Sequence, residues 1–341
     1  MKKLSDFKAL TTMSNNESLT RPVYVISIDE QVNKTGKKQV NIAVKDGVSQ
    51  EKISIFNSDI QSLTSRYPFF MTGSIVDLKI TRNDNYFNAE NEIVENTEEF
   101  DFLEIATRGA NNPPSCFKYI LEKVDEASAD RKDNMHDPLS KLVRQIYMER
   151  KEALLTSSSA IACHHTGIGG NIKHTAEVVN MCVKLLEAEI GRDVDSELLL
   201  AAAALHDVGK TTCYITDKVG ISTMTLDGYA LGGHHFDSIR AVEEAAKNGN
   251  YDKERILILK NIIASHHGSR ESGDLATPMT IEGYWLHTLD DLDAKHYEAR
   301  EEIMSLEPGT WSSKKVYALD TRLYRRTDQQ FNQEADEKSG A

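Results

Sequence analysis

The strongest constraint on the fold is a change of residue pattern near residue 98. Before it, short β-branched runs such as VYVISI, QVNIAVKD, KISIF and SIVDLKI are separated by turn-forming clusters such as NKTGKK. Such runs are typical of antiparallel strands, and about five of them in about 80 residues match the size of an OB-fold. After residue 98 the apolar residues recur at helical spacing. We therefore predict a multi-domain α plus β chain, with a small OB-like β-barrel followed by an all-α helical bundle.

Breaks in the sequence suggest bounds for these parts. NNPPS interrupts the pattern at residues 111–115, and MHDPLSKL has the features of a helix start near Asp137, with Pro138 in its first turn. The end of the chain, DQQFNQEADEKSGA, is polar throughout. The predicted segments are an N-terminal tail (1–18), the barrel (19–97), a helical connector (98–145), the main helical domain (146–325) and a polar tail (326–341).

Composition limits the class of protein. The chain has 341 residues, of which 40% are hydrophobic and 27% charged, which is enough for a sizeable core and a second, smaller domain. No run approaches the ~20 apolar residues of a membrane span, and the first residues lack the apolar segment of a secretion signal. We expect a cytoplasmic protein with no membrane partner. Four cysteines without CxxC spacing are interpreted as reduced packing residues: Cys116, Cys163, Cys182 and Cys213.

The acidic charge is concentrated in the second part of the chain. Residues 1–96 contain 12 Lys or Arg and 12 Asp or Glu, whereas the other 245 residues contain 28 and 41, which gives the net charge of −13. Broad electrostatic capture of a polyanion is therefore disfavoured. If the protein binds a nucleic acid, the first hundred residues are the better place, and divalent metal must offset the charge of the rest.

Aromatic and basic residues of the barrel are candidates for binding a single strand, because rings stack on bases and cations pair with phosphates. Most aromatic residues of a small barrel nevertheless belong to its core. The residues we predict to contact substrate are Lys37, Lys38, Phe56 and Tyr86 in the barrel, and Arg270 further along the chain.

The apolar stretch LLLAAAALHDVGK, residues 198–210, ends in a histidine and an aspartate. Neighbouring residues on a helix diverge by about 100°, so His206 and Asp207 can both reach an ion between them, and Lys210 falls near the same face. A buried carboxylate beside an imidazole is costly without a cation. Four alanines at 201–204 also let other helices approach closely. The stretch therefore indicates a divalent metal site.

Other histidines and acids could complete this site. His174 shares a helical face with apolar residues, GGHH and SHHG contain paired histidines, and LDDLDAK is acidic. A single histidine on an apolar face is more often a hydrogen-bonded core residue than a ligand. The accumulation of these groups in one helical region favours ligands, and mixed His/Asp sets suit Mn²⁺, Fe²⁺, Co²⁺ or Zn²⁺.

The order of these residues resembles a known signature. His174, His206-Asp207, His234, His266-His267 and Asp290 follow the H…HD…H…HH…D order of HD-domain metal-dependent phosphohydrolases. The flanking motifs HHTGIGGNIKHT, LHDVGK, GYALGGH, SHHGSRESG and PMTIEGYWLHTLDDLDAK are similar to those of the YhaM family, bacterial 3′ to 5′ exoribonucleases that also carry an N-terminal OB domain. The likeness is strong from residue 155 to 295. A second histidine, His235, stands where that family usually has an aliphatic residue.

The resemblance implies a set of functional residues. It assigns a divalent metal centre, expected to hold two ions with Mn²⁺ favoured and Fe²⁺, Co²⁺, Zn²⁺ or Mg²⁺ as alternatives. Asp291 and Asp293 compete with the last aspartate of the set, and Asp290 is preferred because it aligns with LDAK. The implied ligands are His174, His206, Asp207 and Asp290 for one position, and His234, His266 and His267 for the other. Asp207 and Lys210 are the catalytic candidates, and His164 and His165 are candidates for supporting the ligands.

The implied activity is a metal-dependent phosphodiesterase. We expect a 3′ to 5′ exonuclease on single-stranded RNA, or on single-stranded DNA, that releases nucleoside 5′-monophosphates by attack of a metal-activated water. One alternative is an HD phosphohydrolase of a nucleotide, cyclic nucleotide or signalling oligonucleotide. The other is a non-catalytic binding module. The expected partner is therefore a single strand or a nucleotide, and a homo-oligomer is left open.

Overall fold

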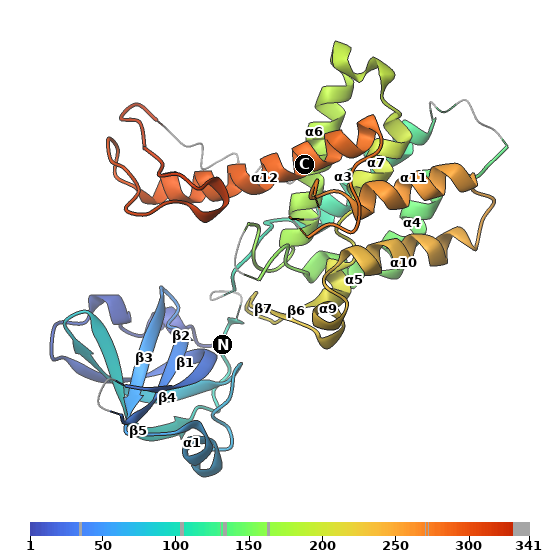
Figure 1. Ribbon diagram of the computed structural model, residues 1–341. Coiled ribbons are helices and arrows are strands. Elements are labelled where there is room, and N and C mark those ends of the chain that lie inside the picture. The colour runs from blue at the N-terminus through green and yellow to red at the C-terminus, as the bar shows by residue number, and fades with distance from the viewer. Residues whose placement is uncertain are drawn as a thin grey trace. The chain divides into compact units, whose positions relative to one another are not determined.

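The computed structural model describes residues 1–33, 36–102, 106–129, 131, 135–161, 164–269, 271 and 273–329. These residues divide into two compact units, which we describe separately (Figure 1). Unit 1 comprises Met1–Ala106 with Asp217–Val219, and unit 2 comprises Thr107–Thr216 with Gly220–Ala341. A barrel precedes a helical region, so the predicted fold class is confirmed. None of the described helices is long and apolar enough to cross a membrane.

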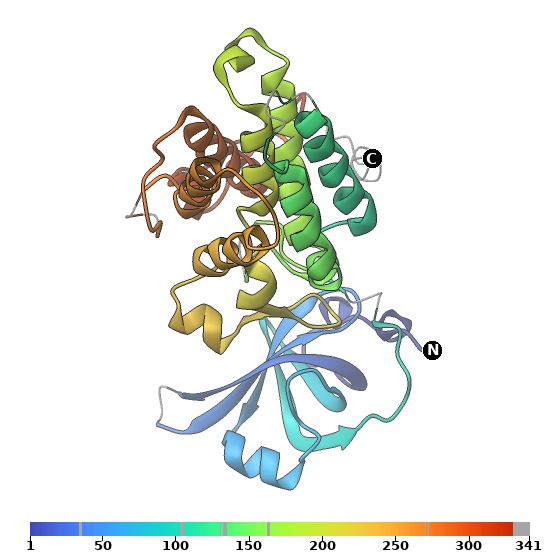
Figure 2. The same ribbon diagram turned by 90° about the vertical axis from the view of Figure 1, so that its right-hand side faces the viewer.

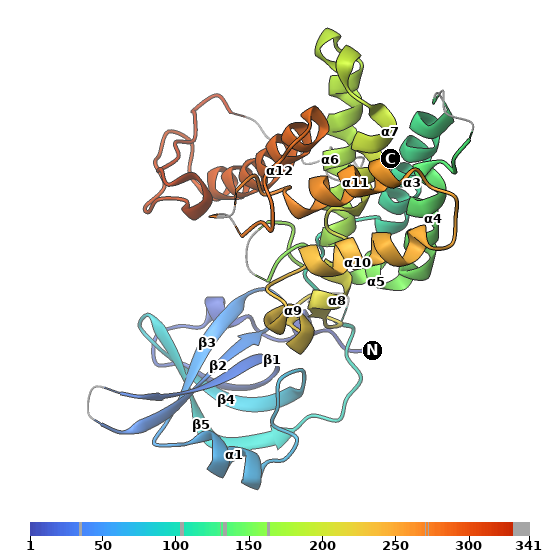
Figure 3. The same ribbon diagram turned by 45° about the vertical axis from the view of Figure 1, so that its right-hand side comes forward.

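Unit 1 is a closed five-stranded barrel (Figure 3). The strand order is β1-β2-β3-β5-β4, in which β1 pairs with both β2 and β4 and β3 runs parallel to β5. Each of the four predicted β-branched runs lies in its own strand. The elements are β1 (Ser18–Val32), β2 (Lys38–Lys45), β3 (Gln50–Phe56), α1 (Ile60–Arg66), β4 (Ile75–Asn83) and β5 (Tyr86–Glu95).

The barrel core is formed by apolar side chains that alternate with exposed ones along the strands. In β3, Ile53 and Ile55 are buried, whereas Lys52 and Phe56 on the other face are exposed. This is the two-residue period of a strand with one apolar face. β5 has a more polar sequence, YFNAENEIVE, which explains why it does not stand out as an apolar run.

The first residues of the chain are held on the barrel by a buried ion pair. Residues 1–18, predicted as a tail, contain the short helices η1 (Leu4–Asp6) and η2 (Leu10–Thr12). The Arg21 guanidinium, 1% exposed, donates to the carbonyl of Leu4 over 2.9 Å and lies 3.4 Å from the Asp46 carboxylate. Asp46 in turn accepts from the backbone N–H of Leu10 over 2.7 Å. The Arg21–Asp46 pair therefore forms hydrogen bonds with backbone groups of both η1 and η2.

Unit 2 is a helical bundle with one small hairpin. Its longest helix, α12, carries the C-terminal part of the chain (Figure 1). The elements are α3 (Pro113–Ala129), α4 (Leu139–Glu149), α5 (Lys151–Thr156), α6 (Gly170–Leu186), η3 (Glu189–Asp193), α7 (Ser196–Leu205), α8 (Lys210–Cys213), β6 (Tyr214–Thr216), β7 (Ser222–Met224), α9 (Leu226–Ala230), α10 (His235–Ala246), α11 (Lys253–Ala264), α12 (Ile281–Ser305) and η5 (Tyr317–Leu319).

The apolar helix α7 lies at the centre of this bundle. It contacts α3, α4, α6, α11 and α12, and the neighbouring helices run side by side (Figure 2). All four alanines at 201–204 are buried, because small side chains let several helices approach at once. The helix begins at an Asp195 cap, whose carboxylate accepts from the Leu198 N–H over 2.9 Å. Its other end delivers His206 and Asp207 into the bundle.

Helices from the predicted connector belong to the same core. Buried residues of α3 and α4 pack in one cluster with those of α6, α7, α10, α11 and α12. The predicted start of the helix near Asp137 is close to the observed one: α4 begins at Leu139, and Pro138 is its N-cap. Three of the four cysteines, Cys116, Cys182 and Cys213, are buried and free, as predicted. Cys163 lies outside the described residues.

Candidate metal centre

All seven predicted ligand residues lie together in unit 2, on elements that are distant in the sequence. His174 is on the inner face of α6, and His206 and Asp207 form the turn after α7. His234 precedes α10, His266 and His267 follow α11, and Asp290 is on α12. Helix ends and inner faces thus supply every one of these side chains. Their roles as ligands stay predictions.

Four of the residues form a first group. His174 Nε2 lies 2.9 Å from Asp290 Oδ1, 3.2 Å from His206 Nε2 and 3.4 Å from Asp207 Oδ2. His206 Nε2 is 3.3 Å from the same Asp207 oxygen. Both histidines are fully buried, and Asp290 is 8% exposed. Two imidazole nitrogens and two carboxylate oxygens therefore converge on one point.

The other oxygen of Asp207 faces a second group. Asp207 Oδ1 is 3.0 Å from His234 Nε2 and 3.7 Å from His266 Nε2, and these two nitrogens are 3.2 Å apart. The His267 ring centroid lies 4.3 Å from that of His266. One carboxylate thus contacts two histidine groups through its two separate oxygens.

Hydrogen bonds at Nδ1 set the tautomers of the buried histidines. His206 Nδ1 lies 2.8 Å from the Ala203 carbonyl, and His266 Nδ1 lies 2.7 Å from the Ile263 carbonyl. A carbonyl can only accept, so each Nδ1 carries the proton and each Nε2 presents a lone pair. Nε2 of His206 and Nε2 of His266 can therefore each act as a metal ligand. The donor set therefore fits a metal ion.

The surroundings of Asp207 also fit a metal ion. Its Oδ1 is buried and accepts no hydrogen bond from any residue in the described part of the chain. A buried carboxylate oxygen without a donor is costly. Imidazole nitrogens with carboxylate oxygens suit divalent ions such as Mn²⁺, Fe²⁺, Co²⁺ or Zn²⁺. The ligand atoms of His174, His206 and Asp290 lie within 4.8 Å of one another, as do those of His234, His235, His266 and His267.

Two glycines permit the close approach of the loops. A Cβ on Gly209, in the HDVGK turn, would lie 2.1 Å from the His234 carbonyl oxygen. A Cβ on Gly170, at the start of α6, would lie 1.8 Å from the His165 carbonyl oxygen. Any larger residue at either position would displace a predicted ligand or its support.

Lys210 points back at the bridging carboxylate. Its Nζ donates to Asp207 Oδ2 over 2.6 Å and lies 3.5 Å from Ser159 Oγ, and the residue is 6% exposed. Burial acts to lower the pKa of Lys210, but the charge of Asp207 raises it above its usual value. Lys210 is therefore a buried cation at the centre.

Burial and charge act differently on the other groups. Burial lowers the pKa of His234 to about 3, against the opposing effect of the Asp207 charge, and burial together with the neighbouring histidines lowers the pKa of His266 well below its usual value, so both imidazoles are neutral as ligands must be. Burial would raise the pKa of Asp207, but the Lys210 charge and the neighbouring histidines hold it well below its usual value. The aspartate is therefore ionised.

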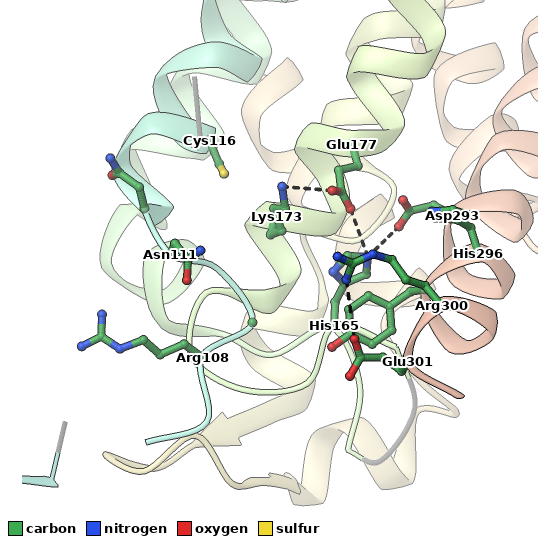
Figure 4. A pocket seen from close by; sticks show the side chains of 13 residues that line it. Arg108, Asn111, Cys116, His165, Lys173, Glu177, Asp293, His296, Arg300 and Glu301 are labelled. Atoms are coloured by element: carbon green, nitrogen blue, oxygen red, sulfur yellow. Dashed lines mark hydrogen bonds and ion pairs between the residues drawn. The ribbon is translucent and has the colours of Figure 1, made fainter. Parts of the chain in front are cut away.

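Asp293, which sequence reasoning ranked below Asp290, contacts the Nδ1 side of the His174 ring. Asp293 Oδ2 lies 2.7 Å from His174 Nδ1 and 2.9 Å from His165 Nε2. The chain of contacts continues from His165 Nε2 to Glu177 over 3.2 Å, and from Glu177 to Lys173 over 2.9 Å (Figure 4). His165 thus contacts the support of a predicted ligand.

A cavity of about 340 Å³ adjoins this chain of contacts. The side chains of Arg108, Lys173 and Arg300 bring positive charge to it, and Glu177, Asp293 and Glu301 bring negative charge (Figure 4). The Tyr297 ring, which also lines it, lies 4.3 Å from the His165 ring.

His235, the departure from the family pattern, is buried beside the second group. Its ring is nearly parallel to those of His234 and His266, with centroids 4.4 Å and 4.5 Å away. Its Nε2 lies 2.9 Å from Asp274 Oδ1, which also accepts from the His267 N–H over 3.1 Å. Asp274 follows no recognisable pattern in the sequence, so its place here could not be predicted.

Of the remaining predicted residues, His164 lies beside this centre, four lie on the barrel, and one lies outside the described residues. His164 is partly exposed, and its ring centroid lies 5.4 Å from that of His174. Lys37, Lys38, Phe56 and Tyr86 are exposed on the barrel. Ile53 pairs with Phe87, so Phe56 and Tyr86 are about four residues apart along the paired strands, about 13 Å. Arg270 lies outside the described residues.

Residues 171–295 match the HD domain family, and this match contains all seven residues. The helical region therefore contains an HD domain and follows an N-terminal barrel, as the motifs predicted.

The particular relatives are exoribonucleases. A protein of Shouchella clausii named 3′-5′ exoribonuclease YhaM is 32% identical over 193 residues, which cover 56% of this chain and 58% of that protein. Proteins of the same name are 29% identical in Bacillus licheniformis, over 67% of this chain and 68% of theirs, and in Oceanobacillus iheyensis, over 70% and 71%. The matched region thus spans less than two thirds of the Shouchella protein. The predicted resemblance to the YhaM family is confirmed by these homologues.

Proposed function

We propose that this chain is a metal-dependent phosphodiesterase that shortens single-stranded RNA from its 3′ end and releases nucleoside 5′-monophosphates. One observation carries the chemical part of the proposal: the two oxygens of Asp207 face two separate histidine groups. The RNA substrate and the direction rest on the relatives named 3′-5′ exoribonuclease.

The residues divide into two ligand sets. His174, His206 and Asp290 would hold one ion, and His234, His266 and His267 the other, with Asp207 shared. Divalent ions in such a pair activate water as a nucleophile and stabilise the charge of a phosphoryl group during displacement. Manganese is the preferred ion, and the histidine-rich set also suits iron, cobalt or zinc.

The chain's own groups prepare the site. Asp293, Ala203 and Ile263 accept the Nδ1 protons of three histidines, so that their Nε2 atoms face the proposed ion positions. Burial would lower the pKa of His174, but hydrogen bonds to Asp290 and Asp293 raise it to about 10, so a bound ion would displace a proton from this Nε2. Lys210, whose Nζ contacts Asp207, supplies a positive charge beside the position of the reacting phosphate. Because these groups are buried, their charges act in a medium that screens them weakly.

The test is hydrolysis of a 5′-labelled single-stranded RNA with Mn²⁺, followed on a gel. We expect a ladder of products that shortens from the 3′ end, and no products from an Asp207→Asn variant. Single-stranded DNA and a panel of nucleotides and cyclic nucleotides are run in parallel. Intact RNA beside rapid turnover of a nucleotide would replace the proposal with a small-molecule phosphohydrolase.

A further inference from the structure

The chain that follows α12 forms an exposed hairpin in unit 2, which we define as residues 306–329 and call the C-terminal hairpin (Figure 1). It folds back on itself through backbone bonds from Gly309 N–H to Arg325 over 2.8 Å and from Val316 N–H to Thr321 over 2.8 Å. The Arg325 side chain donates to the Leu306 carbonyl at the end of α12 over 2.5 Å. The hairpin is therefore an ordered extension of the helix that carries Asp290.

Large aromatic side chains are exposed on this hairpin. Tyr317 is 94% exposed, Trp311 58% and Tyr324 39%. Trp311 and Tyr324 contact each other, with ring centroids 5.2 Å apart, and Tyr317 stands almost fully in solvent. Three exposed aromatic residues within 14 residues indicate a surface that binds a partner.

The hairpin also differs in charge from the helix before it. Residues 306–329 contain five Lys or Arg and three Asp or Glu, whereas residues 281–305 of α12 contain two and seven. The basic residues alternate with the aromatic ones. Arg322 lies over the Trp311 ring, 5.9 Å from its centroid, and Lys314 and Lys315 precede Tyr317.

The hairpin borders a cavity that shares Tyr297 and Glu301 with the cavity beside His165. Lys314, Lys315 and Tyr317 line a cavity of about 800 Å³ together with Thr166 and Tyr297. Tyr297 also lines the smaller cavity beside His165, whose side chain contacts Asp293. Glu298, Glu301 and Glu302 form the other wall of the larger cavity. A polyanion is therefore attracted to the hairpin side and repelled from the helix side.

We propose that the C-terminal hairpin binds single-stranded RNA upstream of the 3′ end that enters the metal centre, and this rests on the proposed function. Bases stack on the rings of Tyr317 and Trp311, and phosphates pair with Lys314 and Lys315. Alternation of rings and cations is the arrangement that holds a single strand without reading its sequence. A protein partner fits less well, because lysine is depleted at the core of protein interfaces.

The experiment measures RNA affinity by fluorescence anisotropy, with a 5′-labelled 20-nucleotide oligouridine and the full chain carrying Asp207→Ala to prevent hydrolysis. In this background we compare Tyr317→Ala and the double variant Lys314→Ala/Lys315→Ala with two controls. Tyr284→Ala removes a tyrosine that is 60% exposed in the first turn of α12, and Lys118→Ala removes an exposed lysine of α3.

We expect Tyr317→Ala to weaken binding about 5- to 100-fold, the usual effect of losing one stacked base. The lysine double variant should reduce the slope of log affinity against log salt by about 1.4, since each phosphate contact on a single strand contributes about 0.7. In an otherwise wild-type chain, neither change should alter Mn²⁺-dependent hydrolysis of bis(p-nitrophenyl) phosphate. Both controls should bind RNA like the parent.

Two results would overturn the inference. The first is that the hairpin variants bind RNA with the same affinity and salt dependence as the controls, although the wild-type chain shortens RNA. The other is a loss of self-association, seen by light scattering, with unchanged RNA affinity, which would make the hairpin an interface between copies of the chain. The proposed function fails on a different result, namely that the wild-type chain leaves RNA intact.

Discussion

Asp293 accepts a hydrogen bond from Nδ1 of His174 over 2.7 Å, while Asp290 lies 2.9 Å from Nε2 of the same ring. The two aspartates are three residues apart on α12 and therefore share a face. Asp291, between them, points away and pairs with Lys295 over 2.7 Å. One helix thus contacts both nitrogens of one imidazole.

We predict that Asp293→Asn weakens metal binding about 10- to 100-fold, the usual effect of removing a carboxylate behind a ligating histidine. Asparagine keeps an oxygen that can accept from Nδ1 but loses the negative charge that makes His174 a stronger ligand. Isothermal titration with Mn²⁺ measures the change. Asp291→Asn is the matched control and should bind Mn²⁺ like the wild type. Equal affinities for the two variants would contradict the role of Asp293.

A second prediction concerns the bridging carboxylate. Asp207→Ala should lower kcat for phosphodiester hydrolysis at least about 10³-fold, because it removes the shared ligand of both ion positions. Excess EDTA should have the same effect on the wild type, and added Mn²⁺ should restore it. Circular dichroism should report an unchanged helical content for the variant. Full activity in excess chelator would refute the metal assignment.

Sequence reasoning found the ligand candidates because helical spacing and motif order carry them. It could not choose between Asp290 and Asp293 by periodicity, because residues three apart lie on one helix face. Asp274 was not predicted, since it comes from a loop that approaches His235 and His267 only through tertiary packing.

Long-range contacts also limited what the sequence could predict about the barrel. Its β-branched runs predicted the strands, but the parallel pairing of β3 with β5 is a long-range choice that alternation does not encode. This register places Phe56 and Tyr86, both predicted to contact substrate, about four residues apart along the paired strands; their role stays a prediction. Tyr24, Phe70 and Phe87 are buried, as expected for most aromatic residues of a small barrel.

A third prediction tests the buried ion pair of the barrel. Arg21→Ala should destabilise unit 1 by about 3 to 5 kcal/mol, because it leaves the buried Asp46 charge without its counter-ion and removes the side-chain donor to the carbonyls of Leu4 and Asp46. Hydrogen exchange of peptides from residues 1–95, measured by mass spectrometry in the full chain, reports this loss. Lys79→Ala breaks an exposed pair with Glu90 and should change protection by no more than about 1 kcal/mol. Equal protection in the two variants would mean that the buried pair adds nothing.

A fourth prediction gives the pH dependence of the same unit. Burial would raise the pKa of Asp46, but the backbone N–H groups of Ser49, Leu10 and Val48 and the Arg21 charge lower it below its usual value. A carboxyl whose folded pKa is depressed stabilises the fold fully above its unfolded pKa, about 3.9, and loses this contribution as pH falls through the folded pKa. Exchange protection of β1 and β2, corrected for intrinsic rates, should therefore decline below about pH 4. Asp46→Asn should be less stable at pH 7 and show a smaller decline, and a decline as steep as that of the wild type would contradict this cause.

The fifth prediction separates the two functions that Lys210 can have. Its ammonium contacts Asp207 over 2.6 Å from a fully buried position, so it can orient the bridging carboxylate or stabilise charge that develops on the reacting phosphate. If it stabilises developing charge, Lys210→Ala should lower kcat about 10²- to 10³-fold and change KM only a few-fold, because the interaction is gained in the transition state. Lys210→Arg should restore part of kcat, since it keeps the charge, and Mn²⁺ affinity should stay within a few-fold of the wild type in both variants. A loss of Mn²⁺ affinity that parallels the loss of kcat would instead make Lys210 a positioning residue for Asp207.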